Sequence, residues 1–121
     1  MKIGFIGLGN MAKAMIGGML REGIVEAGDI IGSAKTRATL ECRKEEFHIM
    51  TSESNQYVAE YADVVILAVK PVFLSEVIGE IREAVTEKKL VISIAAGKSM
   101  EWIEREFGKR IVIYKTWKNS V

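Results

Sequence analysis

Short apolar runs alternate with amphipathic stretches along the whole chain. Each apolar run is only a few residues long, so we predict β-strands at 2–6, 29–33, 48–50, 62–69, 90–94 and 110–114. Between these runs, apolar positions recur at helical spacing, which predicts helices over 10–21, 37–47, 54–61, 73–85 and 100–107. Ser99 is the expected N-cap of the last helix.

This regular alternation predicts an α/β fold of the Rossmann type. Short joints between strand and helix favour a doubly wound, mainly parallel sheet with helices on both faces, in three layers. Because crossovers are right-handed almost without exception, the expected strand order is 3-2-1-4-5-6. Ligands of such sheets bind beyond the carboxyl ends of the strands, where the order reverses. We therefore expect the ligand site at 7–10 and 68–71, after the first and fourth strands.

Composition narrows the class of protein further. The chain has 121 residues, 49% hydrophobic and 27% charged, as expected of one globular domain. Its net charge is +1, and no apolar run approaches the length of a membrane span, so we expect neither a nucleic-acid nor a membrane partner. The single cysteine, Cys42, excludes an internal disulfide and favours a reducing, cytoplasmic setting. The lone histidine, His48, gives no reason to expect a metal site.

The stretch GFIGLGNMAKAM carries Gly7, Gly9 and Ala12 at the spacing G-x-G-x-x-G/A. A predicted strand precedes it and a predicted helix follows, which is the context in which this spacing binds a dinucleotide pyrophosphate. In that interpretation Gly7 allows the tight turn, and Gly9 allows the backbone to approach the phosphates. The alternative is a compact turn without a ligand. Gly17 and Gly18 in the same helix predict a further close contact with the sheet.

The end of the second strand indicates which dinucleotide to expect. The segment IIGSAKTRA has no acidic residue, whereas NAD sites usually place a carboxylate there for the ribose 2′-hydroxyl. Instead it offers the hydroxyls of Ser33 and Thr36 and the cations of Lys35 and Arg37, which suit a 2′-phosphate. We therefore expect NADP(H), with NAD(H) as the weaker alternative. The other interpretation makes the two cations ordinary solvated charges.

Four segments together resemble the N-terminal domain of pyrroline-5-carboxylate reductase. They are MKIGFIGLGNMAKAMIGGML, SAKTR, AVKP and ISIAAG, in the family's order across residues 1–112. The resemblance implies an NADP-binding Rossmann domain of an oxidoreductase that reduces 1-pyrroline-5-carboxylate, a small imine, to L-proline in proline biosynthesis. The cofactor of such an enzyme supplies the hydride, and the protein supplies placement and electrostatics.

The resemblance also implies where each part of the cofactor binds. The pyrophosphate would lie at 7–11, the adenosine phosphate near 33–37, the adenosine ribose near Asn55, and the nicotinamide between 68–71 and 95–97. The implied cofactor-binding residues are Gly7, Leu8, Gly9, Asn10, Met11, Ser33, Lys35, Arg37, Asn55, Ala68, Val69, Lys70, Pro71, Ala95, Ala96 and Gly97. No catalytic residue is assigned, and Lys70 is either a cofactor contact or a plain surface lysine.

The end of the sequence departs from the family's pattern. The segment IYKTWKNSV does not match the methionine-proline-asparagine-threonine-proline segment found there, so we expect a domain over 1–114 and a divergent basic tail over 115–121. As a cofactor-binding domain only, the chain is expected to be inactive alone and to form a homo-oligomer through its exposed apolar strand 110–114. Two alternatives stay open: the cofactor domain of a β-hydroxyacid or imine dehydrogenase, and a non-catalytic nucleotide-binding module.

Overall fold

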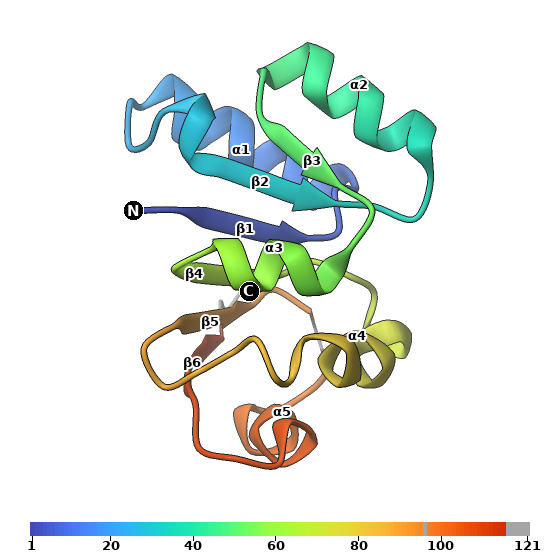
Figure 1. The fold of residues 1–121 in the computed structure, drawn as a ribbon, viewed down its shortest axis with the longest axis vertical. Helices are drawn as coiled ribbons and strands as arrows, with labels where there is room; N and C mark the ends of the chain where they lie inside the picture. Colours follow the sequence, from blue (N-terminus) through green and yellow to red (C-terminus); the bar gives the residue numbers. More distant parts are fainter. Residues whose placement is uncertain (96, 116–121) are drawn as a thin grey trace.

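The computed structural model describes residues 1–95 and 97–115, and within them it forms one parallel sheet. The strands are β1 (Ile3–Ile6), β2 (Ile30–Ser33), β3 (Met50–Ser52), β4 (Val64–Leu67), β5 (Leu90–Ser93) and β6 (Val112–Lys115). They follow the order β3-β2-β1-β4-β5-β6, from top to bottom in Figure 1. Every neighbouring pair is parallel, so the expected Rossmann-type fold and strand order are confirmed.

Helices cover both faces of this sheet. They are α1 (Asn10–Arg21), α2 (Arg37–Phe47), α3 (Asn55–Tyr61), α4 (Leu74–Ile81) and α5 (Met100–Phe107), with 3-10 turns η1 (Ala27–Asp29) and η2 (Pro71–Phe73). Phe5 of β1 packs in a core with α1 and α2, while its neighbour Ile6 packs in a second core with α3, α4 and α5. The three expected layers are therefore present. No helix among the described residues is long and apolar enough to cross a membrane.

A side chain caps the N-terminus of three helices but not that of α1, the helix that follows the glycine loop. Thr36, Ser54 and Ser99 cap α2, α3 and α5, and each side chain accepts a hydrogen bond from a backbone N–H in the first turn. This confirms the expected cap at Ser99. By contrast, α1 begins after Gly9, and no side chain caps it. The first N–H groups of α1 are thus left for another acceptor.

Four elements have an end at least two residues from the one expected, and one of them is β6, which was expected over 110–114 and spans Val112–Lys115. Strand β3 starts at Met50 because His48 adopts a left-handed conformation, φ 61°, as the residue that ends α2. Helix α4 starts at Leu74 because Pro71 opens a 3-10 turn first, and it ends at Ile81. Strand β4 spans only Val64–Leu67, so the residues after it form a loop at the carboxyl edge of the sheet.

Polar contacts join the elements at the opposite, amino edge. The Lys2 ammonium donates to the Asp29 carboxylate over 3.1 Å, which ties the start of β1 to η1. This hydrogen bond, together with the nearby Tyr61 hydroxyl, raises the pKa of Lys2 above its ordinary value of 10.5. The carboxyl edge, where the candidate site residues lie, carries the loops described next.

Candidate cofactor-binding site

The loop between β1 and α1 requires glycine at its first position. Gly7 has φ +104°, and a Cβ there would lie 2.9 Å from the carbonyl oxygen of Ala68. Its N–H donates to the Ser33 carbonyl oxygen over 3.1 Å. The tight turn therefore runs between the carboxyl ends of β2 and β4, at the point where the strand order reverses.

Gly9 is small for a different reason. Its backbone is extended, with φ −76° and ψ −162°, and a Cβ there would meet nothing within 4 Å. Open space at Gly9, an uncapped start of α1 and no acidic residue in its first turn together suit an anion. This cradle fits the pyrophosphate of a dinucleotide.

The loop is held from two sides by Gly32 and Arg43, neither of which the sequence singled out. The buried Leu8 side chain packs on Gly32 of β2, where a Cβ would lie only 2.5 Å from a Leu8 methyl carbon. The Arg43 side chain, on α2, donates from Nε to the Leu8 carbonyl oxygen over 3.0 Å. No sequence motif marks Arg43, because its partner is a backbone atom of a distant loop.

A cavity of about 350 Å³ lies at this edge of the sheet. Several of the predicted residues line it together, from four segments of the chain: Gly7, Ser33, Lys35, Asn55 and Val69. Residues that sequence analysis did not assign complete the lining: Ala34, Glu53, Phe73, Glu76, Val77 and Glu80. The structure therefore brings together three of the residues expected around the adenosine half of a cofactor, Ser33, Lys35 and Asn55, but not Arg37.

A chain of hydrogen bonds orients the polar groups of this cavity. The Ser33 hydroxyl donates to Asn55 Oδ1 over 2.5 Å, and Asn55 Nδ2 donates to Glu80 Oε1 over 2.7 Å. Ser33 is almost fully buried at the end of β2, and Asn55 is the first residue of α3. The amide of Asn55 is thus fixed between a strand end and a helix of the neighbouring segment.

Both cations of the predicted phosphate site have protein partners. Lys35 Nζ lies 3.2 Å from the centroid of the Phe73 ring, a cation–π contact. Arg37 Nη2 lies 3.0 Å from Glu53 Oε2. Arg37 stands at the start of α2 rather than in the cavity wall, and Glu53 connects it to that wall.

The residues expected around the nicotinamide differ in their exposure, and of those described only Val69 lines the cavity. Ala95 is buried, and its side chain belongs to the core with α5. Gly97 turns with φ +85° in open space, and Ala96 lies outside the described residues. Ala68 follows β4 directly, Lys70 is exposed and Pro71 opens η2. Asn10 and Met11 are exposed at the start of α1.

The acidic residues of the cavity are the main feature that sequence reasoning missed. Glu53 follows β3, and the carboxyl ends of all parallel strands meet at one edge, so its position was accessible from the predicted strand order. Glu76 and Glu80 are four residues apart on α4, which places both on one face of that helix. The end of β2 carries no acidic residue, but the lining of the cavity as a whole contains these three.

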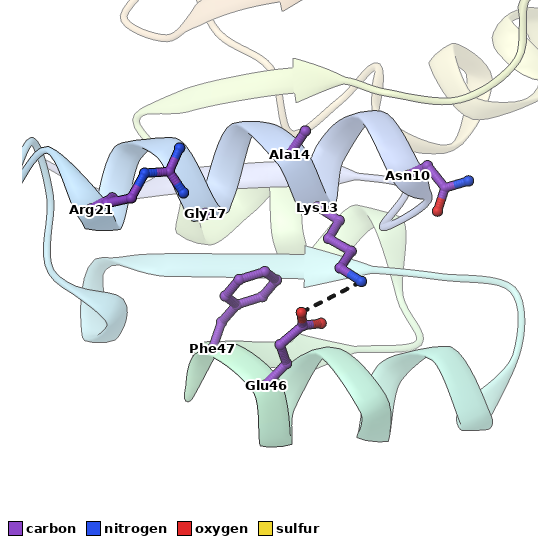
Figure 2. A pocket seen from close by; sticks show the side chains of 7 residues that line it. All are labelled: Asn10, Lys13, Ala14, Gly17, Arg21, Glu46 and Phe47. Atoms are coloured by element: carbon purple, nitrogen blue, oxygen red, sulfur yellow. Dashed lines mark ion pairs between the residues drawn. The ribbon is translucent and has the colours of Figure 1, made fainter.

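A second cavity, of about 420 Å³, lies between α1 and α2 (Figure 2). An ion pair spans this cavity: Lys13 Nζ lies 3.5 Å from Glu46 Oε2, and the Phe47 ring lies beside the pair. Only Asn10 of the predicted cofactor residues lines this cavity. Among the described residues, no cluster of three metal-ligating side chains is present.

Several known proteins are similar to this chain in sequence and in fold. Residues 2–97 match the family model described as NADP oxidoreductase, coenzyme F420-dependent. The pyrroline-5-carboxylate reductase of Escherichia coli is 37% identical over 119 residues, which is 98% of this chain and 44% of the relative. The chain therefore spans less than half the length of the curated relatives it matches.

Two solved structures of reductases align with nearly all of this chain. That of the pyrroline-5-carboxylate reductase from Coxiella burnetii is 36% identical, with a TM-score of 0.89 over 94% of this chain and 42% of that one. That of the Plasmodium falciparum pyrroline carboxylate reductase, with NADP bound, is 27% identical, with a TM-score of 0.78 over 94% and 40%. The chain belongs to the family of NADP oxidoreductases described as coenzyme F420-dependent, and its relatives include pyrroline-5-carboxylate reductases.

Proposed function

We propose that this chain is the NADP(H)-binding domain, residues 1–114 with a basic tail over 115–121, of an oxidoreductase of the pyrroline-5-carboxylate reductase type. The observation that carries the proposal is that two features lie next to each other at the carboxyl edge of the sheet. They are the open space at Gly9 and the cavity lined by Ser33 and Asn55, and Gly7 belongs both to the glycine loop and to the lining of the cavity. The NADP bound in the Plasmodium falciparum relative supports the choice of cofactor.

In this proposal each group of residues has one task. The N–H groups at the start of α1 bind the pyrophosphate, Ser33 and Asn55 bind the adenosine ribose and its phosphate, and Lys35 and Arg37 add positive charge. Bound NADPH would supply a hydride to the C=N carbon of a small imine such as 1-pyrroline-5-carboxylate, giving L-proline. No described residue is assigned a catalytic role, and Lys70 stays a candidate contact of the cofactor.

The alternatives differ in what they predict for binding and turnover. A β-hydroxyacid or imine dehydrogenase domain would use the same cradle, and a non-catalytic module would bind a nucleotide without supporting any reduction. We favour the reductase because the relatives named above are 36% and 37% identical to this chain. We also propose a cytoplasmic location, since Cys42 is a free, exposed thiol of the kind that persists in a reducing compartment.

Nucleotide titration tests the binding site. We expect NADPH to bind more tightly than NADH, measured by nicotinamide fluorescence, because charge-assisted contacts to a phosphate contribute about 1.5–3 kcal/mol each. Gly9→Val should abolish binding of both nucleotides while circular dichroism shows a folded chain. Gly28→Val is the matched control, since Gly28 also has open space around it but lies in η1, at the other edge of the sheet. Equal binding by the Gly9 variant would disprove the cradle.

A turnover assay tests the assignment of tasks. The chain alone should bind NADPH without oxidising it in the presence of 1-pyrroline-5-carboxylate, because hydride transfer needs the imine held about 3–3.5 Å from the nicotinamide. A complete reductase serves as the positive control. Turnover within about tenfold of that control would mean that this chain contains a substrate site of its own.

A further inference from the structure

An ion pair stands where the 2′-phosphate of NADP is proposed to bind. Arg37 Nη2 lies 3.0 Å from Glu53 Oε2, and their side chains are 75% and 65% exposed. Arg37 is the first residue of α2, just beyond β2, and Glu53 follows β3. Because β2 and β3 are neighbours in the sheet, the pair bridges their carboxyl ends beside the loop that carries Lys35.

The guanidinium of Arg37 is therefore paired with the Glu53 carboxylate when no phosphate is bound. A carboxylate and a phosphate use the same donors of a guanidinium, since each presents a pair of anionic oxygens that accept two parallel N–H groups. The two anions also repel each other. A bound 2′-phosphate must either displace Glu53 from Arg37 or share the cation with it.

The other charges near the site do not relieve this competition. Lys35 is the single cation in the described lining of the cavity, and its ammonium lies over the Phe73 ring. Of the three lining carboxylates, Glu80 accepts a hydrogen bond from Asn55, and Glu76 has no cation within ion-pair distance among the described residues. Glu53 is the acid that engages a cation proposed for the phosphate.

We propose that Glu53 is a specificity-determining residue that limits the preference of this chain for NADP over NAD. Its carboxylate competes with the 2′-phosphate for Arg37, whereas a free ribose 2′-hydroxyl carries no charge and does not compete. The inference rests on the proposed function, because it presupposes that a dinucleotide binds with its adenosine ribose in this cavity. It concerns discrimination between two cofactors and is separate from binding as such.

Replacing the carboxylate by an amide of the same shape tests this inference. In E53Q the affinity for NADPH should rise about two- to fivefold, the change that an exposed ion pair of ordinary strength implies, while the affinity for NADH changes by less than about 1.5-fold. Glu87→Gln is the matched control: it removes the same charge from an exposed site in the turn before β5, at the amino edge of the sheet. Calorimetric titration with two ligands that lack the nicotinamide half should give the same result: E53Q should bind adenosine 2′,5′-bisphosphate more tightly and adenosine 5′-monophosphate with unchanged affinity.

A double variant tests whether the effect of Glu53 on affinity depends on Arg37. The gain from E53Q should fall to less than half in an R37Q background, because the competed donor is then gone. A ratio of NADPH to NADH affinity that is unchanged or lower in E53Q would overturn the inference, and so would an undiminished gain in R37Q/E53Q. If the unmodified chain binds neither nucleotide, the proposed function fails as well; if it binds both and E53Q leaves the ratio unchanged, this inference alone fails.

Discussion

Two glycines of one loop serve different physical purposes. At Gly7 the backbone has φ +104° and a Cβ would collide with the Ala68 carbonyl oxygen at 2.9 Å, so the fold itself requires glycine. At Gly9 the backbone is extended and the surrounding space is open, so the fold tolerates a side chain and only a ligand would exclude one. The sequence spacing treats both glycines alike, and the structure separates them.

The same substitution at the two positions should therefore change the stability by different amounts. Gly7→Ser should lower the free energy of unfolding by about 1–3 kcal/mol, the usual cost of a non-glycine residue in a strained backbone conformation. Gly9→Ser should change it by less than about 0.5 kcal/mol, because serine is as good an N-cap as glycine. Urea denaturation of the two variants measures the difference. Similar losses in both would contradict the separation of roles.

Local sequence patterns were sufficient to bring some of the predicted site residues to one edge of the sheet. The spacing of Gly7 and Gly9 and the hydroxyl of Ser33 at the end of β2 depend on neighbours in the chain, and the structure places Gly7 and Ser33 at one cavity. Arg43 and Glu80 were missed because each acts on a partner remote in sequence, the Leu8 carbonyl oxygen and the Asn55 amide. Such contacts depend on how α2 and α4 pack, which periodicity does not specify.

At the scale of elements, α1 packs differently from the expectation. Gly17 and Gly18 were expected to allow close contact with the sheet. A Cβ at Gly17 would instead meet the Phe47 ring at 3.7 Å, and one at Gly18 would meet only Arg21 at 3.7 Å, both ordinary contact distances. The buried face of α1 is formed by Ala12 and Ile16, and Gly17 borders the groove between α1 and α2 (Figure 2).

Alanine at these positions should stabilise the protein. Gly17→Ala and Gly18→Ala should each raise the free energy of unfolding by about 0.5–1 kcal/mol, because glycine in a helix interior costs that much relative to alanine and the added methyl groups meet no clash. Thermal unfolding of each variant, with the unmodified chain as reference, measures the effect. A loss of stability in either variant would show that the helix needs glycine there for a reason the packing does not reveal.

The strong apolar runs were predicted well as elements, and the weak ones less well. Strands β1, β2 and β5 lie where the sequence placed them, since each is apolar and bounded by turn residues. Strand β3 was placed two residues early, because the left-handed conformation of His48 leaves no sequence signal of its own. Helix α4 was predicted too long, because its apolar pattern continues to Val85, which is buried beyond the helix end.

At the scale of the whole molecule, the sheet is unevenly covered within the described residues. On the face that carries α1, the apolar side chains of β1, β4 and β5 line a hollow of about 570 Å³ with Met15 and Met19. The register continues this apolar face onto β6, where Val112 pairs with Leu90 and Tyr114 with Ile92. Val112 is 48% and Tyr114 63% exposed, whereas Ile113 packs on the other face against the core with α5. The apolar strand that was expected to be exposed is thus exposed on one face only.

Association of copies should therefore depend on this face of β6. We expect the average mass in light scattering to rise with protein concentration, because apolar side chains exposed at the last strand of the described sheet gain free energy by leaving water. Val112→Lys with Tyr114→Lys should move the midpoint of association to about tenfold higher concentration or beyond, since burying one such side chain contributes about 1.5–3 kcal/mol. Val72→Lys, at a position 79% exposed in η2, is the control for added charge and should leave the midpoint within about twofold. A chain that stays monomeric at millimolar concentration, or variants that associate like the control, would show that β6 is not a contact between copies.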